Sequence, residues 1–300
     1  MIKLKSLFFL FLSLVITTIV ATGTVIAAPG TTSIVEYAKF NSTSLGSSIN
    51  YAVSLPASYN KDSLQRYPIV IFLHGLFNDE KDWQDRGIQA KLDELRSSGK
   101  VGEYIIAIPY GANSFYLNAK NGLRYEDAIV KDFIPFIDKT YRTNPKNRMI
   151  AGISMGGYGA LMIAFKHPEM FVGVAAHCAA LFEELPKAPT SPKDTRGKYR
   201  YEIANQLYGK PLDLEHFQQN NPLQLAKVNI EKIKNLKIYF DIGQQDRYGF
   251  EVANQQLDSI LTKANIKHEF NLVEGEHGWS FLLARTEPAF IFYWNTLKQN

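Results

Sequence analysis

The residue with the clearest chemical potential is Ser154, at the centre of the pentapeptide GISMG (152–156). An apolar run (149–153) precedes the serine and small, helix-forming residues follow it, so the pattern predicts a strand, a sharp turn and a helix. Such a turn strains the backbone of the serine and leaves room only for glycine two residues to either side. It also places the hydroxyl at a helix N-terminus, which stabilises developing negative charge. We therefore predict that Ser154 is a nucleophile rather than part of a purely structural glycine turn.

A serine nucleophile needs a general base to take its proton. His277 lies in the loop EGEHGW (274–279), between the last predicted strand and the last predicted helix, with a glycine close on either side. This location lets the imidazole reach over the carboxyl edge of the predicted sheet, so we predict that His277 is the base. The remaining histidines lie at strand or helix ends, inside an apolar strand or within 181–234: His74, His167, His177, His216 and His268.

Two aspartates are candidates for the acid that orients the imidazole. Asp241 lies inside the apolar run LKIYFDI (236–242), where its side chain is expected to contact the body of the sheet or to cap its end. Asp246 lies in the loop that follows, one helix and one strand before His277. We predict Asp246 as the acid and keep Asp241 as the alternative. The resulting order of serine, aspartate and histidine is the order that an α/β-hydrolase fold gives.

The oxyanion that forms when a serine attacks a carbonyl needs hydrogen-bond donors. One predicted donor is the backbone N–H of Met155, directly after the nucleophile. The second is expected in the loop after the strand PIVIFLH (68–74), and we assign it to the backbone N–H of Leu76. Because both donors belong to the backbone, the identity of these two side chains is expected to matter little.

Together these residues predict a two-step acyl transfer, in which an acyl-enzyme forms on Ser154 and His277 then activates water. The reaction needs no cofactor, and no clustered His/Cys spacing for a metal ion is found in the sequence. Three alternatives stay open. They are an acyltransferase in which a sugar or another alcohol replaces water, an exopeptidase with the same triad, and a non-catalytic binding protein on the same fold.

Strand-like and helix-like segments alternate from residue 33 onward, which predicts a mostly parallel sheet with helices on both faces. The first two strands are not separated by a helix and are expected to form an antiparallel edge. Strands are expected at 34–41, 48–55, 68–74, 104–109, 147–154, 171–179, 236–242 and 268–273. Helices are expected at 88–95, 125–141 (bent near Pro135), 156–167, 252–261 and 281–297.

The predicted catalytic domain covers 28–300, and composition and length agree with a single α/β-hydrolase domain. One segment departs from the alternation. Residues 181–234 are rich in Pro, Lys, Asp and Gln and only weakly helical. We interpret them as a cap or insertion over the C-terminal edge of the sheet, where such folds bind ligands. The walls of the substrate pocket are expected to come from this segment.

The first 27 residues have the layout of a secretory signal peptide. Lys3 and Lys5 precede an apolar run (7–21), and small residues follow it up to Ala28, so cleavage after Ala27 is predicted. The apolar run is short for a membrane span of about 20 residues. The protein is therefore expected to be secreted or periplasmic. The alternative is an uncleaved segment that anchors the protein to a membrane.

Charge and cysteine content narrow the classes of partner. The net charge is +4, and removal of Lys3 and Lys5 leaves about +2, which argues against nucleic acid as a partner. The single cysteine, Cys178, lies in an apolar run (173–180) and is predicted to be a buried structural thiol. The expected partner is a small-molecule ester, including esters linked to carbohydrate.

Five segments extend these motifs into a wider resemblance: FLHGLFNDEKDW (72–83), RYEDAIVKDFIPFIDKTYRT (124–143), GISMGGYGA (152–160), FDIGQQD (240–246) and EGEHGW (274–279). Over about 47–297 the chain resembles the esterase branch of the α/β-hydrolases. That branch contains S-formylglutathione hydrolase (esterase D), bacterial tributyrin and feruloyl esterases, and the mycobacterial mycolyltransferases. The resemblance implies the same site: Ser154, Asp246 and His277, with Leu76 and Met155 as oxyanion donors.

The chain departs from the resembling groups at two points. The formylglutathione enzymes are cytosolic, so the predicted export signal argues against that activity. The mycolyltransferases carry an arginine directly after the Gly-Leu of their oxyanion loop, where this chain has Phe77. We therefore predict an exported serine carboxylesterase acting on short-acyl or on feruloyl- and acetyl-type esters.

Overall fold

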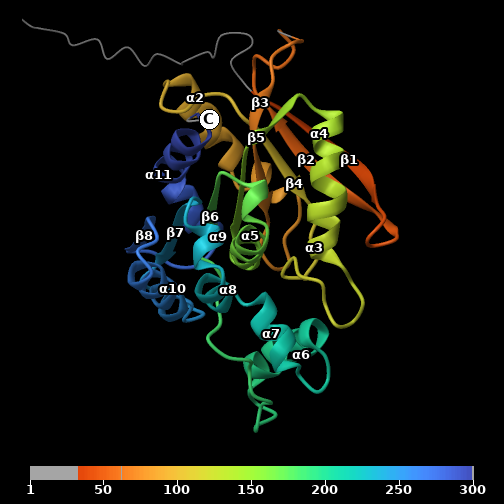
Figure 1. The fold of residues 1–300 in the computed structure, drawn as a ribbon, viewed down its shortest axis with the longest axis vertical. Coiled ribbons are helices and arrows are strands. Elements are labelled where there is room, and N and C mark those ends of the chain that lie inside the picture. Colours follow the sequence, from red (N-terminus) through yellow and green to blue (C-terminus); the bar gives the residue numbers. More distant parts are fainter. Residues whose placement is uncertain (1–32, 62, 299–300) are drawn as a thin grey trace, which may run out of the picture.

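A computed structural model describes residues 33–61 and 63–298, which form an eight-stranded sheet between layers of helices (Figure 1). The strand order is β1-β2-β4-β3-β5-β6-β7-β8. The first two strands are antiparallel, β2 is antiparallel to β4, and the others run parallel. The strands are β1 (Ile34–Ser42), β2 (Ser47–Leu55), β3 (Tyr67–Leu73), β4 (Ile105–Pro109), β5 (Thr143–Ile153), β6 (Gly173–His177), β7 (Lys237–Gly243) and β8 (His268–Val273). The predicted α/β-hydrolase architecture is confirmed, while the predicted signal segment lies outside the described residues.

The central strands are buried because helices cover both faces of the sheet. Every residue of β4 and β6 is buried, as is nearly all of β3, which explains their continuous apolar sequences. On one face α1 (Asp82–Asp85), α2 (Ile88–Ser97) and α11 (Trp279–Leu297) enclose a core that contains Trp83 and Phe290. The opposite core is covered by α3 (Tyr125–Asp127), η1 (Ala128–Phe133), α4 (Ile134–Thr140), α5 (Met155–Lys166), α8 (Pro222–Val228), α9 (Ile230–Ile233) and α10 (Glu251–Lys263).

The helix expected at 125–141 forms, but it is not one uniform α-helix. An α-helical turn leads into the π-helix η1, and α4 follows with Pro135 in its first turn. Proline lacks an N–H and its ring crowds the carbonyl four residues earlier, so the α-helical hydrogen-bond ladder cannot run through this point. The predicted bend near Pro135 therefore takes the form of the π-helix η1, which directly precedes α4. A second difference is the end of β6 at His177 rather than 179, since Cys178 adopts φ +45° and leaves the extended conformation.

The segment 181–234 holds α6 (Thr195–Tyr208) and α7 (Leu214–Asn220) in addition to α8 and α9. In Figure 1, α6 and α7 lie at one end of the molecule, beyond the layers of the sheet and its helices. Lys166 of α5 links α7 to the helices that cover the sheet. Its ammonium donates to Glu126 Oε2 at 2.7 Å and to Asn220 Oδ1 of α7 at 2.7 Å. The hydroxyl of Tyr158, also on α5, donates to the carbonyl of Asn220 at 2.8 Å.

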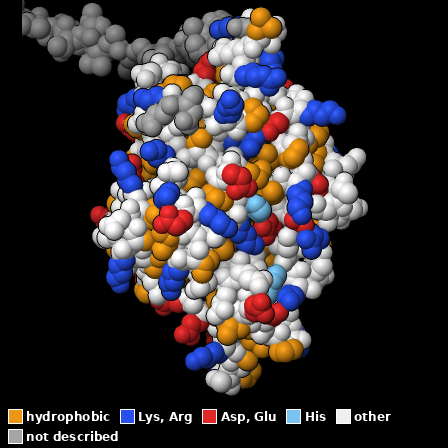
Figure 2. Space-filling model, viewed as in Figure 1, with side chains coloured by type: hydrophobic (Ala, Val, Ile, Leu, Met, Phe, Trp, Pro, Cys, Tyr) orange, Lys and Arg blue, Asp and Glu red, His pale blue; other side chains and the backbone are white. Residues whose placement is uncertain are grey.

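The surface of the described residues carries side chains of both charges as well as apolar ones. On the face drawn in Figure 2, basic and acidic side chains are interspersed, with apolar side chains between them. Among the residues that the structure describes, no helix combines the length and the apolar character needed to cross a bilayer.

Candidate active site

Ser154 lies on the predicted sharp turn between β5 and α5. Its backbone has φ +57° and ψ −115°, a conformation that L-residues rarely adopt, and α5 begins at the next residue. Two bonds hold the strained backbone in place. The Ser154 N–H donates to the carbonyl of His177 at 2.8 Å, and the Ser154 carbonyl accepts from Ala180 N–H at 3.0 Å. The hydroxyl therefore stands at the helix N-terminus above the carboxyl ends of β5 and β6.

The two glycines of the pentapeptide are required by close packing. A Cβ on Gly152 would lie 2.3 Å from the carbonyl oxygen of Gly156. A Cβ on Gly156 would lie 1.9 Å from the carbonyl oxygen of Leu73, at the end of β3. No side chain can move to relieve these contacts because both involve backbone atoms. Only glycine therefore fits at these two positions, as the steric argument from the sequence predicts. The turn also brings α5 into close contact with the end of β3.

Gly156→Ala is expected to reduce both stability and activity, because the new methyl group must separate α5 from the end of β3. Overpacking of this kind costs about 1–3 kcal/mol or more. The displacement would also change the spacing between Met155 and Leu76. Thermal unfolding and ester hydrolysis should be measured together. Gly122→Ala is a matched control, because a Cβ added at Gly122 would meet no atom within 4 Å. Gly122 has φ +95°, so the alanine should cost only about 1 kcal/mol of stability from backbone strain. Equal losses of melting temperature and of activity in the two variants would contradict the packing argument.

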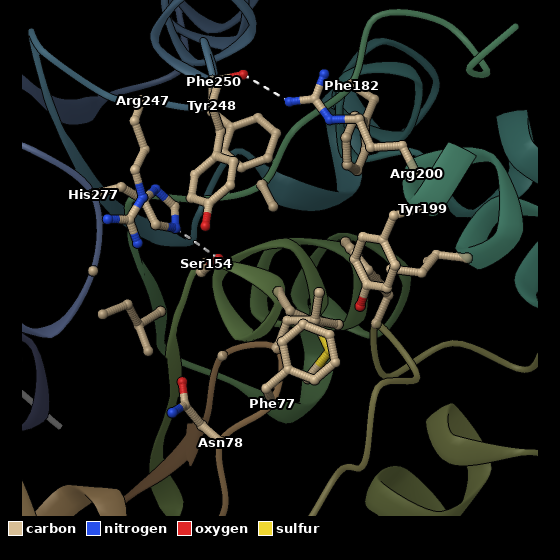
Figure 3. A pocket seen from close by; sticks show the side chains of 18 of the residues that line it. Phe77, Asn78, Ser154, Phe182, Tyr199, Arg200, Arg247, Tyr248, Phe250 and His277 are labelled. Atoms are coloured by element: carbon tan, nitrogen blue, oxygen red, sulfur yellow. Dashed lines mark hydrogen bonds between the residues drawn. The ribbon is translucent and has the colours of Figure 1, made fainter. Parts of the chain in front are cut away.

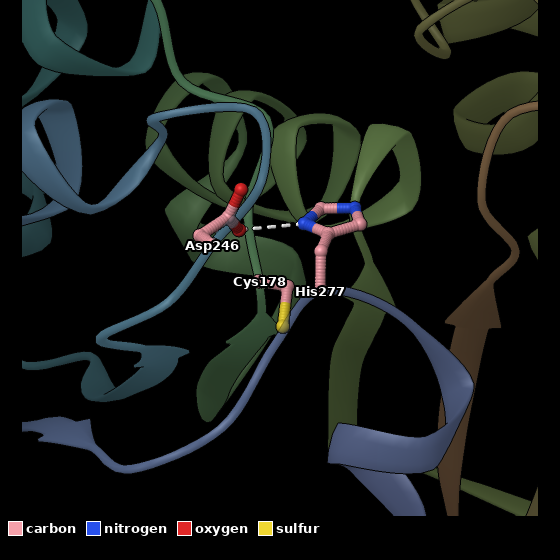
Figure 4. Close-up of side chains that lie close together, drawn as sticks. All are labelled: Cys178, Asp246 and His277. Carbon is pink, nitrogen blue, oxygen red and sulfur yellow. Dashed lines mark hydrogen bonds and ion pairs between the residues drawn. The ribbon is translucent and has the colours of Figure 1, made fainter.

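The structure brings Ser154, His277 and Asp246 into one hydrogen-bonded chain; the bond between Ser154 and His277 is drawn in Figure 3 and that between His277 and Asp246 in Figure 4. The serine Oγ donates to His277 Nε2 at 2.9 Å. Nδ1–H of the same imidazole donates to Asp246 Oδ2 at 2.6 Å. The carboxylate of Asp246 is fully shielded from solvent and the imidazole is 6% exposed. In this arrangement Nε2 has its lone pair directed at the hydroxyl, as proton abstraction requires.

The loops that carry Asp246 and His277 are bonded to each other. Gln244 N–H donates to the carbonyl of Val273 at 2.8 Å, and Gln245 N–H donates to that of Gly275 at 3.0 Å. The Gln245 side chain accepts from Gly275 N–H at 2.8 Å. Asp246 is held further by its Oδ1, which accepts from Tyr248 N–H at 2.8 Å. The loops after β7 and β8 are therefore held together by hydrogen bonds of their own, and His277 extends from them to Ser154.

Asp241, the alternative acid, lies in a different network. Its buried Oδ1 accepts from His177 Nδ1–H at 2.7 Å, and its Oδ2 accepts from the hydroxyl of Tyr239 at 2.7 Å. Arg285 of α11 approaches the same carboxylate at 3.4 Å, and His177 Nε2 accepts from Tyr293 at 2.6 Å. Burial and the charge of Asp241 raise the pKa of Tyr239, so this tyrosine stays a neutral donor. Asp241 thus joins strands and α11 inside the core and does not contact His277.

The two predicted oxyanion donors, Leu76 and Met155, line the same cavity as Ser154. Met155 N–H is the first amide of α5, where a helix supplies no internal acceptor. Within residues 33–61 and 63–298, neither this amide nor that of Leu76 has a hydrogen-bond partner. Phe77, the next residue, has φ +62°, and its N–H donates to Asn113 Oδ1 at 2.9 Å. The amide of Leu76 is therefore available as a donor, whereas that of Phe77 is not.

A supporting residue of the oxyanion loop, His74, was not singled out for a role from the sequence. Its Nδ1–H donates to the carbonyl of Gly75 at 2.8 Å, and its Nε2 accepts from Gly111 N–H at 2.8 Å. Burial lowers the pKa of His74, which keeps the imidazole neutral and able to accept. The histidine thereby ties the loop after β3 to the loop after β4. The only sequence signal was its position directly before Gly75 at the end of a buried strand.

Ser154 and His277 open into a cavity of about 810 Å³ under the cap segment. The wall comes largely from aromatic and aliphatic side chains of the cap and of the loop after β7, which the sequence left unassigned. Phe182 packs on Phe250 with ring centroids 5.5 Å apart, and Phe77 packs on Tyr199 of α6 at 5.6 Å (Figure 3). The apolar lining consists mainly of Leu76, Phe77, Phe115, Phe182, Tyr199, Ile203, Ala204, Leu207, Phe217, Tyr248 and Phe250.

Cys178 lies next to the triad, and its Sγ is within 4.8 Å of ligand atoms of Asp246 and His277 (Figure 4). Such a group could in principle hold a metal ion. However, burial raises the pKa of the Cys178 thiol, which opposes formation of the thiolate that a metal requires. The other two members already bond to each other at 2.6 Å. These contacts favour the predicted structural role for Cys178.

The mostly parallel sheet, the strained serine turn and the order of the site residues define an α/β-hydrolase. The chain matches the model of the Esterase family over residues 42–285 and belongs to that family. It is 30% identical to an acetyl esterase of Caldicellulosiruptor saccharolyticus over 213 residues, which are 70% of this chain and 76% of the relative. The protein is thus a serine hydrolase that acts on carboxylic ester bonds.

Two further matches involve feruloyl esterases. An endo-1,4-beta-xylanase/feruloyl esterase of Xylanibacter ruminicola is 31% identical over 147 residues, covering 46% of this chain and 20% of that longer protein. A solved ferulic acid esterase has the same fold, with a TM-score of 0.75 at 24% identity over 89% of this chain and 99% of that chain. The resemblance to the esterase branch inferred from the sequence is confirmed.

Proposed function

We propose that the protein is an exported carboxylesterase in which Ser154 is the nucleophile, His277 the general base and Asp246 the orienting acid. The observation that carries the proposal is the unbroken chain of hydrogen bonds from Ser154 through His277 to a buried carboxylate, at 2.9 and 2.6 Å. The shorter bond lets Asp246 orient the imidazole, and the longer one is within the distance at which His277 Nε2 can take the proton of Ser154.

The proposed reaction has two steps. His277 takes the serine proton while Oγ attacks the ester carbonyl, and the amides of Leu76 and Met155 stabilise the oxyanion. The imidazolium then protonates the leaving alcohol. In the second step the same imidazole removes a proton from water, which attacks the acyl-enzyme and releases the acid. Asp246 keeps Nδ1 protonated throughout, so that Nε2 is the atom that accepts and returns the proton.

The acyl group that the cavity favours is aromatic, of the feruloyl type. A volume of about 810 Å³ is near the upper end of the range for small-molecule sites, whereas an acetyl group would leave most of it empty. Rings from Phe115, Phe182 and Phe250 line the apolar part and can pack against a planar acyl group. The second candidate is acetyl-ester hydrolysis, which the 30% identity to an acetyl esterase favours.

A panel of 4-nitrophenyl esters with one leaving group and different acyl groups separates these candidates. The panel should include ferulate, cinnamate, butyrate and acetate, with each kcat/KM divided by the rate of hydroxide-catalysed hydrolysis of the same ester. We expect the corrected value for ferulate to exceed that for acetate by more than about tenfold, or about 1.4 kcal/mol. A corrected preference for acetate would favour the acetyl esterase instead. Adding a sugar acceptor and analysing products separates hydrolysis from acyl transfer.

Export is the remaining part of the proposal, and it is supported by the layout of residues 1–27. Expression of the full chain followed by N-terminal sequencing of the protein outside the cytoplasm tests it. We expect the mature chain to begin at Ala28. Full-length protein retained in the membrane fraction would favour the anchored alternative.

A further inference from the structure

Three arginine side chains gather on one wall of the cavity, around the loop that follows Asp246. Arg196 and Arg200 come from α6 of the cap, and Arg247 comes from the loop itself. Figure 3 shows Arg200 and Arg247 near the rings of Tyr248 and Phe250. The guanidinium carbons of Arg196 and Arg247 lie 5.0 and 5.1 Å from the centre of the Tyr248 ring. That of Arg200 lies 5.9 Å from the ring of Phe250. The three positive charges therefore lie around the rings of Tyr248 and Phe250, next to His277.

Within the described part of the chain, none of these arginines forms an ion pair. The two acids whose charges act on Arg200 are both engaged elsewhere. Asp194 caps α6 by accepting from Gly197 N–H at 2.7 Å, and Asp246 bonds His277. Burial, and to a smaller extent the charge of Arg196, lower the pKa of Arg200, so these two guanidinium groups are close enough to repel each other.

Part of the hydrogen-bonding capacity of the three arginines is unused. Arg196 donates to the carbonyl of Arg247 at 2.6 Å, and Arg200 donates to that of Tyr248 at 2.9 Å. A guanidinium has five N–H donors, so most remain free on both. The side chain of Arg247 makes no hydrogen bond to any described residue. It is the most available cation of the three for a group outside the chain.

The position of His277 indicates which part of an ester would meet these charges. The leaving oxygen must approach Nε2, because the imidazolium protonates it. The ring of Tyr248 packs against the imidazole with centroids 4.7 Å apart, and Arg247 and Arg196 flank that same ring. The leaving alcohol is therefore the part of the substrate next to the arginines. The acyl group extends toward the apolar lining of the cap.

We propose that the site selects esters whose leaving alcohol carries an anionic group, a carboxylate or a phosphate, bound by Arg247 with Arg196 and Arg200 behind it. The proposal rests on the proposed ester hydrolysis and adds the charge of the alcohol to it. Guanidinium groups bind both anions through paired N–H donors. An anionic substrate would then form the direct ion pair that none of the three arginines makes with a described residue.

A pair of esters that differ only in the charge of the alcohol tests this proposal. Both carry the same acyl group, on 4-hydroxybenzoate in one and on neutral 4-hydroxybenzamide in the other, and a third arm uses 4-hydroxyphenyl phosphate. Each kcat/KM is corrected for the hydroxide-catalysed rate. We expect at least about a fivefold preference for a charged ester at low salt, shrinking toward unity at about 0.5 M salt because ions screen the contact. The arm with the larger preference identifies the anion.

Arg247→Gln should bring the charged-to-neutral ratio close to 1, and Arg247→Lys should restore part of it. Lys198→Gln is the matched control, since it removes the same charge from α6 at an exposed pair, 4.0 Å from Glu202. This control should keep the wild-type ratio. A wild-type ratio at or below 1, or a preference that survives in Arg247→Gln, overturns the subsite. If neither neutral nor charged ester is hydrolysed, the proposed function itself fails, which is a separate result.

Discussion

Replacement of Ser154 by alanine is expected to lower kcat for ester hydrolysis by about 10⁶-fold, since removing the nucleophile of a serine hydrolase leaves only binding and the oxyanion donors. The structure gives a specific reason why the neighbouring Cys178 does not replace it. Its thiol is buried, and burial raises the pKa of this thiol, which opposes formation of a nucleophilic thiolate. The assay should use a 4-nitrophenyl ester, with a fluorophosphonate probe to detect covalent labelling.

The same variant should remain folded. The strained backbone at Ser154 is held through its N–H to His177 and its carbonyl to Ala180, and alanine keeps both bonds. We expect the melting temperature to change by only a few degrees, as for a loss of about 1 kcal/mol or less. Activity within tenfold of wild type, or unchanged fluorophosphonate labelling in a folded Ser154→Ala protein, would remove the central assignment.

Asp246→Asn is expected to lower kcat by about 10⁴-fold, the loss typical when the acid of a triad becomes an amide. An asparagine can donate its N–H to Nδ1 of His277 across the present 2.6 Å contact. The imidazole would then carry its proton on Nε2, which faces Ser154, and could not accept the serine proton. Stopped assays over a range of pH should show a low kcat with KM nearly unchanged.

Asp241→Asn is the matched comparison, because both aspartates are buried and both bond a histidine at Nδ1. Loss of this charge leaves Arg285 without its carboxylate and weakens the bond to His177, so the expected effect is on stability. Breaking a buried pair typically costs about 3–5 kcal/mol, seen as a lower melting temperature. The kcat of the folded fraction should stay within about tenfold. A large kcat loss in Asp241→Asn, together with an active Asp246→Asn, would reverse the two assignments.

The sheet could be predicted because the apolar pattern that marks each strand depends only on residues within that strand. Strands buried on both faces must be apolar along their whole length, and β3 and β4 show this directly in the sequence. The relation between Gly152 and Gly156 was also predictable, because it depends on sterics within a single turn. For the aspartates, the apolar run around Asp241 placed it inside a strand and left Asp246 in the loop.

The cap could not be predicted in the same way. Helix α6 carries arginines and tyrosines that face the cavity, so its apolar face is too weak to distinguish it from a surface loop. Tyr199 contacts Phe77, and Arg200 contacts the carbonyl of Tyr248. These partners are far apart along the chain, and no local pattern encodes such contacts. The substrate walls are therefore the part of the site that only the structure shows.

The bonds between the loops after β7 and β8 have a mechanical consequence. Gln245 joins the acid loop to the base loop by its own backbone and side chain, whereas Ser154 is attached to β5 and to the carbonyl of His177. The three site residues therefore lie on two separately held segments, and the hydrogen bond between Ser154 and His277 is the triad contact that joins them. On heating we expect this contact to lengthen before the pair of His277 and Asp246 separates. Heating should switch catalysis off, reversibly, at temperatures below those at which the sheet comes apart.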